Sequence, residues 1–241
     1  MKSTTLKFSL GFALALLVMA PVVRADANLA PGTSQSPVQN DTPFQAFVAG
    51  GFCGGPCNIL AEILDAPYTI KDALGNVTQT GIYSTVVLVD NNTGDLDFAY
   101  EFEVETGTDP YISEATASSF GGFTTEVGYD SSGIVIDGGY TGASGLIAPT
   151  SVNRSAGPGV TINFEFTPGD VGPSGYASYD LLVETNASFY TAGTFGLQDN
   201  ANSGPLAAFA PATVPEPTSV LLLTGVVLAA FGAIRRKTRM V

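Results

Sequence analysis

The chain has 241 residues, with nine basic and 22 acidic side chains, two cysteines, no tryptophan and no histidine. The absence of histidine excludes Ser-His-Asp and Cys-His catalysis, histidine-ligated zinc or copper, and the usual near-neutral proton shuttle. The acidic balance argues against nucleic acid as a partner, because nucleic acid is bound through clusters of lysine and arginine.

The N-terminus has the three-part pattern of a secretory signal peptide. Lys2 and Lys7 supply positive charge, residues 8–19 form an apolar run, and Val23 and Ala25 place small residues at positions −3 and −1. This pattern predicts a signal peptide over residues 1–25 and export with cleavage after Ala25. The alternative is an uncleaved membrane anchor, for which the apolar run is short.

The basic residues are concentrated at the two ends of the chain. Only Lys71 and Arg154 lie between residues 26 and 234, and all 22 acidic residues lie there, so this stretch has a formal charge of −20. Such a surface repels anionic lipid headgroups and keeps an exported protein soluble. It leaves weak binding of divalent cations open, although a solvated acidic surface is the more common explanation.

Composition divides the part between the two ends into three stretches. Residues 26–42 are rich in Pro, Ser, Gln and Asn without apolar periodicity, which predicts a flexible lead-in. Residues 43–203 are long enough for one domain with a sizeable core. Residues 204–218 are predicted to be a linker, which contains a Pro-Glu-Pro motif.

The domain has the pattern of an all-β protein. Short alternating runs are separated by Gly, Pro, Asn and Ser, which predicts an antiparallel, jelly-roll-like β-sandwich. The clearest pair of strands covers residues 83–89 and 95–105, joined by a turn at 90–94. In the second strand apolar residues alternate with acidic or small ones, which predicts one buried and one solvated face: Phe98, Tyr100, Phe102 and Val104 against Ala99, Glu101, Glu103 and Glu105.

Residues 58–65 are an expected exception. Four apolar residues there share one face of a helix, namely Ile59, Leu60, Ile63 and Leu64. The asparagine at position 58 is a favourable N-cap, so a short helix is predicted.

Cys53 and Cys57 are separated by three residues, two of which are glycine. In an exported protein an even number of cysteines favours a disulfide, which for so short a loop is worth about 2 kcal/mol. The alternative is a redox or metal pair, but thioredoxin-type motifs have two intervening residues and a metal site needs further soft ligands.

Two acidic patterns suggest chemistry without establishing it. Residues 90–97 crowd oxygen ligands into a turn, but an EF-hand loop needs glycine at its sixth position and Gly94 is the fifth. A hairpin turn with solvated acids is therefore expected, with neither a metal nor a cofactor. Any two of the 22 acids could form the carboxylate pair of a glycosidase, although Glu101, Glu103 and Glu105 have the regularity of a solvated strand face.

The C-terminus has the pattern of a membrane anchor. Residues 220–234 are uncharged and would form a helix of about 22 Å, short of the roughly 30 Å hydrocarbon core. Thr218 and Ser219 add length, and either is a natural N-cap. A cluster of basic residues follows and is expected to stay on the cytoplasmic side, so residues 219–241 are predicted to be a transmembrane helix and basic stop: Arg235, Arg236, Lys237 and Arg239. A buried core helix is the alternative, against which the abrupt basic end argues.

The motif Val214, Pro215, Glu216 and Pro217, the single apolar helix and the terminal Arg-Arg-Lys cluster together resemble the PEP-CTERM sorting signal of bacterial exported proteins. The resemblance implies processing by an exosortase, a membrane-embedded enzyme similar to cysteine transpeptidases. It also implies a transient inner-membrane anchor, followed by cleavage near the motif and arrival at the cell surface or in the extracellular matrix. No LPxTG motif is present, which disfavours the Gram-positive sortase system.

Residues 175–217 also resemble the final strands of many substrates of this kind. The resemblance implies a non-enzymatic structural or interaction protein associated with exopolysaccharide, as in a biofilm or floc. The alternative is a carbohydrate-binding module or weak glycosidase, which should have a groove lined by tyrosine or phenylalanine and paired carboxylates.

Overall fold

Every regular element in the described part of the chain is a β-strand. The computed structural model describes residues 27–40, 58–90, 93–107, 111–130, 143–199, 201–202 and 205–213. Within these stretches no helix is long and apolar enough to cross a membrane. The all-β class predicted from the alternating runs is confirmed.

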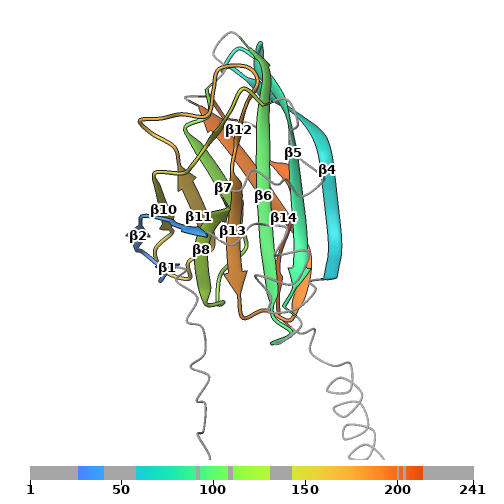
Figure 1. The fold of residues 1–241 in the computed structure, drawn as a ribbon, viewed down its shortest axis with the longest axis vertical. Helices are drawn as coiled ribbons and strands as arrows, with labels where there is room; N and C mark the ends of the chain where they lie inside the picture. Colours follow the sequence, from blue (N-terminus) through green and yellow to red (C-terminus); the bar gives the residue numbers. More distant parts are fainter. Residues whose placement is uncertain are drawn as a thin grey trace, which may run out of the picture.

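Nine strands form one mixed sheet (Figure 1). Across it the order is β4, β5, β6, then β12 and β13 end to end, then β9 beside β12 and β8 beside β13, with β1 and β3 beyond β8. The pairings are antiparallel except β3 with β8 and β9 with β12. The strands are β1 (Ala27–Asn28), β3 (Val38–Asn40), β4 (Asn58–Lys71), β5 (Val77–Val89), β6 (Leu96–Gly107), β8 (Thr125–Asp130), β9 (Gly145–Ile147), β12 (Tyr176–Ser178) and β13 (Asp180–Thr185).

Seven strands form the second sheet, which is antiparallel. Its order is β16, β14, β7, β11, β10 and β2, with β15 pairing the end of β14. The strands are β2 (Ser34–Gln35), β7 (Glu114–Ser118), β10 (Ser151–Arg154), β11 (Thr161–Glu165), β14 (Phe189–Asp199), β15 (Ala201–Asn202) and β16 (Leu206–Ala212).

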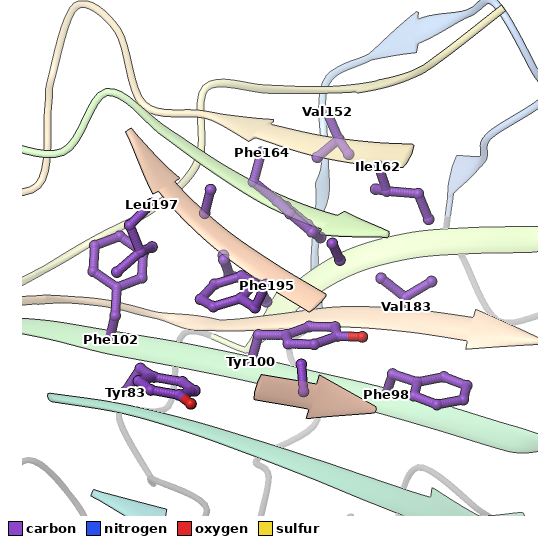
Figure 2. Close-up of a cluster of buried hydrophobic side chains, with 14 of the residues drawn as sticks. Tyr83, Phe98, Tyr100, Phe102, Val152, Ile162, Phe164, Val183, Phe195 and Leu197 are labelled. Carbon is purple, nitrogen blue, oxygen red and sulfur yellow. The ribbon is translucent and has the colours of Figure 1, made fainter. Parts of the chain in front are cut away.

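The two sheets face each other across an aromatic core, which gives a β-sandwich-like fold (Figures 1 and 2). The period-two pattern of β6 is confirmed on its inner side, where all four predicted core residues are at most 1 % exposed: Phe98, Tyr100, Phe102 and Val104. The ring of Tyr100 stacks on Phe195 of the other sheet, with centroids 5.1 Å apart and planes 13° apart. Burial of such rings dominates the energetics of a core of this size.

The helix predicted for residues 58–65 is wrong, because these residues form the first half of β4 and pair with β5. The register shifts twice, between Ile59 and Ala61 and again between Ile63 and Ala66. Each shift is a bulge that resets the in–out alternation, so apolar residues fall at helix-like spacing within a strand. Leu60 and Leu64 remain 45 % and 37 % exposed on this edge.

The predicted domain limits of residues 43 and 203 are too narrow. Strands β1 to β3 lie within the predicted lead-in, and Leu29 there is fully buried. Strand β16 lies within the predicted linker, yet every one of its residues pairs with β14. The sandwich therefore includes residues 27–40 and reaches Ala212.

Both ends of the described chain lie at the same end of the sandwich. At the N-terminal side, the Leu29 amide donates to the Thr125 carbonyl, and Thr125 pairs with Thr185. At the C-terminal side, Ala212 pairs with Phe189. The short connection from β13 to β14 thus lies between the two ends.

One of the two cations of the body is buried in the fold. Arg154 is 3 % exposed, and its guanidinium donates five hydrogen bonds of 2.7–3.1 Å to uncharged acceptors. The acceptors are the Thr125 hydroxyl and the carbonyls of Leu29, Phe120, Phe123 and Gly159. Burial lowers the pKa of Arg154, but arginine stays protonated in proteins. The side chain therefore joins the N-terminal segment to three other parts of the domain.

Replacing Arg154 with Met is expected to lower the free energy of unfolding by about 3 kcal/mol, because several buried acceptors lose their donor. Urea unfolding followed by circular dichroism measures the change. Lys71→Met, at the exposed end of β4, is the matched control and should change stability by no more than about 0.5 kcal/mol. Equal effects of the two substitutions would show that the buried network is not a major source of stability.

Candidate functional site

The residues to which the sequence assigns an addressing role or a disulfide lie outside the described residues. Their roles stay predictions. They are Ala25 at the signal cleavage position, Cys53 and Cys57, the motif Val214, Pro215, Glu216 and Pro217, and the basic stop Arg235, Arg236, Lys237 and Arg239.

The described part of the calcium-like stretch forms a turn between β5 and β6, as expected, but Asp90 and Asp97 are buried, at 8 % and 5 % exposed, so the prediction of solvated acids is wrong for these two. The Gly94 amide donates to the Asp90 carbonyl at 2.7 Å, and the Asp90 amide donates to the Asp95 carbonyl at 2.9 Å. Gly94 has φ of 78°, a conformation that favours glycine. Among the residues that the structure describes, no group of three or more His, Cys, Asp or Glu side chains is arranged to hold a metal ion.

The carboxylates of β6 differ from the predicted solvated face. Glu105 is exposed and Glu103 is half-buried, but Glu101 is only 1 % exposed. Burial raises the pKa of Glu103, and the charges of Glu105 and Asp65 raise it further. The prediction of a solvated acid is therefore wrong for Glu101, since this part of the outer surface of the nine-stranded sheet is buried.

The outer side of the seven-stranded sheet is a polar surface, which we call the polar face. Along β7, β10 and β11 every second residue is buried in the core, and the residues between them point outward and are partly exposed. With the neighbouring outward residues of β14, the polar face comprises Glu114, Thr116, Ser118, Ser151, Asn153, Thr161, Asn163, Glu165, Thr194 and Gln198.

Strand pairing arranges the polar face in rows across the sheet. One row runs through Gln198, Glu114, Glu165 and Ser151, which are successive cross-strand partners. The next row begins at Gly196 and runs through Thr116, Asn163 and Asn153; a Cβ added at Gly196 would lie 4.0 Å from Thr116, in ordinary van der Waals contact. Neighbouring groups in a row are separated by the strand spacing of about 4.8 Å.

Side-chain hydrogen bonds orient part of this face. The Asn153 amide donates to Glu165 Oε1 at 2.9 Å, and the Asn163 amide donates to Asn153 Oδ1 at 3.0 Å. The Thr116 hydroxyl donates to Glu114 Oε1 at 2.8 Å. The result is a partly ordered array of donors and acceptors on a sheet surface.

Glu114 and Glu165 are direct cross-strand partners and form the closest carboxylate pair that the registers place on the polar face. Burial is the main cause that raises the pKa of Glu165, and the charge of Glu114 raises it further, while the hydrogen bond from Asn153 opposes the shift. Two like charges in this position destabilise the sheet when both are ionised.

The exposed aromatic residues lie elsewhere. Phe189 and Tyr190 are 45 % and 39 % exposed at the far end of β14, beside Ala212 and Pro211 of β16. Tyr111 is 41 % exposed before β7. Because Phe189 and Tyr190 begin β14 and Gln198 near its other end pairs with Glu114, these two rings are separated from the Glu114–Glu165 pair along the strand.

Sequence reasoning did not find the polar face as a unit. The alternation in residues 161–165 indicates which side chains of β11 point outward. However, Glu114 and Glu165 come together only through the pairing of β7 with β11, which no local pattern specifies. The amide and carboxylate rows therefore required the structure.

Comparison with known proteins gives no match: no family model, no curated protein and no solved structure matches this chain. The described part of the chain is an all-β, sandwich-like domain with a polar face on its second sheet.

Replacing Glu165 with Gln is expected to raise stability at pH 7 by about 0.5 kcal/mol, because it removes a partly buried charge and its repulsion from Glu114 and keeps an acceptor for Asn153. A raised pKa in the folded state means that the folded protein holds the proton more tightly, so the unfavourable contribution is absent below the ordinary glutamate pKa and develops as pH rises through the raised one.

Thermal unfolding of both proteins at pH 7 and near pH 3.5, below the ordinary glutamate range, measures this dependence. The difference should disappear at the lower pH. Glu62→Gln, at an exposed carboxyl on β4, is the control. A gain of the same size at both pH values would contradict the electrostatic cause.

Proposed function

We propose that this chain is an exported, exosortase-processed structural or interaction protein of the bacterial cell surface or exopolysaccharide matrix. The observation that carries the proposal is the C-terminal order of motif, apolar span and basic stop: Val214, Pro215, Glu216 and Pro217, then residues 219–234, then Arg235, Arg236, Lys237 and Arg239. The signal-peptide pattern that ends at Ala25 supports the same route. In this proposal the body is a non-enzymatic, jelly-roll-like β-sandwich.

The position of β16 leaves only a short connection between the sandwich and the proposed membrane anchor. The strand ends at Ala212 and the span is expected to begin at Ser219, so residues 213–218 alone connect them. At the maximum extension of a chain these residues reach only about 20 Å. While anchored, the domain would lie close to the bilayer, and the exosortase would cut Pro215, Glu216 or Pro217 within this narrow gap.

The chemistry of the polar face favours a hydroxyl-rich polymer as partner. Its amides, hydroxyls and carboxylates offer both donors and acceptors to sugar hydroxyls. None of its ten residues is Lys or Arg. A neutral polysaccharide therefore fits this face better than an anionic one.

The same face supports a second candidate function, that of a carbohydrate-binding module or weak glycosidase. Glu114 and Glu165 lie opposite each other on neighbouring strands. In a retaining glycosidase two carboxyl groups lie about 5 Å apart, and the one with the raised pKa serves as the acid. In this alternative Glu165 would be the acid and Glu114 the nucleophile.

Intact-mass analysis of the protein from an exosortase-positive host and from its exosortase-deletion strain tests the sorting route. We expect a C-terminus near Pro215, Glu216 or Pro217 in the first host and an uncut tail in the second. A C-terminus at Val241 in both strains would refute exosortase processing.

Co-sedimentation with the exopolysaccharide of the host tests the role of the polar face. Asn163→Ala is expected to weaken binding about fivefold, since one hydrogen bond from an amide side chain to the polysaccharide is worth about 1 kcal/mol. Thr69→Ala, exposed on β4 of the other sheet, is the control and should bind normally.

Release of reducing ends separates the two candidate functions. The structural protein should release none, whereas a glycosidase should lose its activity in Glu165→Gln.

In the co-sedimentation experiment, equal binding by Asn163→Ala and the unmodified protein would rule out the polar face as the contact surface.

A further inference from the structure

One end of the sandwich gathers exposed apolar side chains around the point where β16 ends. Phe189 and Tyr190 begin β14, and the register pairs them with Ala212 and Pro211, the last two residues of β16. Both rings are exposed, unlike the aromatic side chains of the core. Because cross-strand partners are neighbours, the two rings lie beside the residue from which the chain continues toward its C-terminus.

Strand β4 brings further apolar groups to the same end. The Tyr190 hydroxyl donates to the Leu60 carbonyl at 3.4 Å, so the start of β4 lies beside the start of β14. Ile59 and Leu60 are exposed as well. The ring of Tyr190 also packs edge-on against Phe209 of β16, with centroids 5.7 Å apart. We call Ile59, Leu60, Phe189 and Tyr190 the apolar end of the sandwich.

The sequence that forms β14 and β16 is almost without charge. Between Glu184 and Glu216 the only charged residue is Asp199, in a body with a formal charge of −20. Asp199 lies at the other end of β14, where its neighbour Gln198 pairs with Glu114. Because charged groups resist removal from water, the surface around the start of β14 is easier to dehydrate than the acidic remainder.

Acidic groups beside the apolar end limit the kind of surface that it can approach. Glu62 is exposed on β4, and Asp95 precedes Leu96, whose amide donates to the carbonyl of the β13–β14 connection. Neither cation of the body offsets them, since Lys71 ends β4 at the far side and Arg154 is buried. A zwitterionic layer therefore fits this end better than an anionic one.

The end of β16 determines what the apolar end faces in an anchored chain. Residues 213–218 connect Ala212 with the proposed span, which begins at Ser219, and reach at most about 20 Å. The headgroup layer takes up roughly 6 Å of this distance, half the difference between the full bilayer and its hydrocarbon core. So short a tether turns the end that carries it toward the bilayer and keeps the local concentration of lipid high.

We propose that the apolar end of the sandwich rests on the headgroup layer of a zwitterionic bilayer while the chain is anchored. The contact rests on the proposed function, which supplies the anchor. Phenylalanine, tyrosine and leucine suit it, because such side chains concentrate at the boundary between membrane and water. The contact holds the Pro-Glu-Pro motif at the surface, and cleavage there removes the tether, so the released domain keeps only the weak affinity of a few side chains.

A second copy of the chain is the less favourable occupant. Every anchored copy has its apolar end beside its own tether, so copies in one bilayer present this end toward the membrane and not toward each other. Contact between two apolar ends would also bring Glu62 and Asp95 of both copies together, and like charges at an interface oppose association.

Tryptophan fluorescence of the full exported chain, taken uncut from an exosortase-deletion strain and reconstituted in phosphatidylcholine vesicles, tests the proposal. The chain has no tryptophan, so Tyr190→Trp supplies a single reporter at the apolar end. Tyr111→Trp is the matched control, because Tyr111 is similarly exposed and precedes β7 at the opposite end of the sandwich.

Vesicles whose acyl chains are brominated near the headgroup should lower the emission at position 190 at least about twofold, since an interfacial side chain enters roughly 5–10 Å into the boundary of headgroups and acyl chains. The emission at position 111 should change by less than about 10 %, because that end projects away from the bilayer.

A charge introduced at the apolar end should weaken the contact. Phe189→Asp, combined with Tyr190→Trp, is expected to reduce the quenching by bromine to less than about half, because a carboxylate resists entry into the boundary layer. Val77→Asp adds the same charge at the exposed start of β5, at the other end of the sandwich, and should leave the quenching unchanged. Circular dichroism verifies that both variants are folded.

Flotation of the vesicles separates this proposal from the function on which it rests. Protein that does not float with the vesicles would refute the membrane anchor, and the contact with it. Protein that floats but shows no quenching at position 190, or equal quenching at positions 190 and 111, would leave the anchor standing and overturn the contact alone. Emission at position 190 that shifts to the blue without quenching by bromine would identify a second copy as the cover and would also overturn the contact.

Discussion

The stacking of Tyr100 on Phe195 joins the two sheets across the core. The ring of Tyr100 fills the core, and its hydroxyl donates to the Phe209 carbonyl of β16 at 3.0 Å. Tyr83 repeats the arrangement with the Ala207 carbonyl, also at 3.0 Å. Burial raises the pKa of Tyr100, so its phenol remains a neutral donor at any physiological pH. The same side chains thus build the core and hold the last strand, which sets the point from which the chain continues.

Arg154 has the corresponding role for the N-terminal strands. It holds Leu29 through a carbonyl and uses no carboxylate, in a body that contains 22 acids. Carbonyl dipoles satisfy the guanidinium without bringing a second charge into the interior, which avoids part of the desolvation cost of a buried ion pair. The N-terminal segment is thus held by one buried arginine together with the pairing of β1 and β3 with β8 and of β2 with β10.

Local patterns predicted what is local in this fold. The buried inner face of β6 and the turn at Gly94 were predicted correctly, since both depend on period and on backbone preference. The bulges of β4 and the burial of Glu101 depend on neighbouring strands and could not be derived from the sequence. Strand β16 was missed because its alanines and Pro211 have low strand propensity, which pairing with β14 and the two tyrosine hydroxyls overrides. The polar face likewise exists only through non-local pairing.

Both described ends lie at one end of the sandwich. The domain is therefore a cassette, that is, a unit that two flanking sequences can carry without passing through it. Material joined before Ala27 and after Ala212 meets the same side of the fold, beside the β13–β14 connection. The sandwich can therefore be exchanged between two flanking sequences without a change in their separation, in the way that inserted domains are accommodated in a host protein. Its opposite end, which includes the Asp72–Asn76 hairpin turn, projects away from whatever those sequences are attached to. Variation in such turns would alter what the cassette displays without disturbing how it is held.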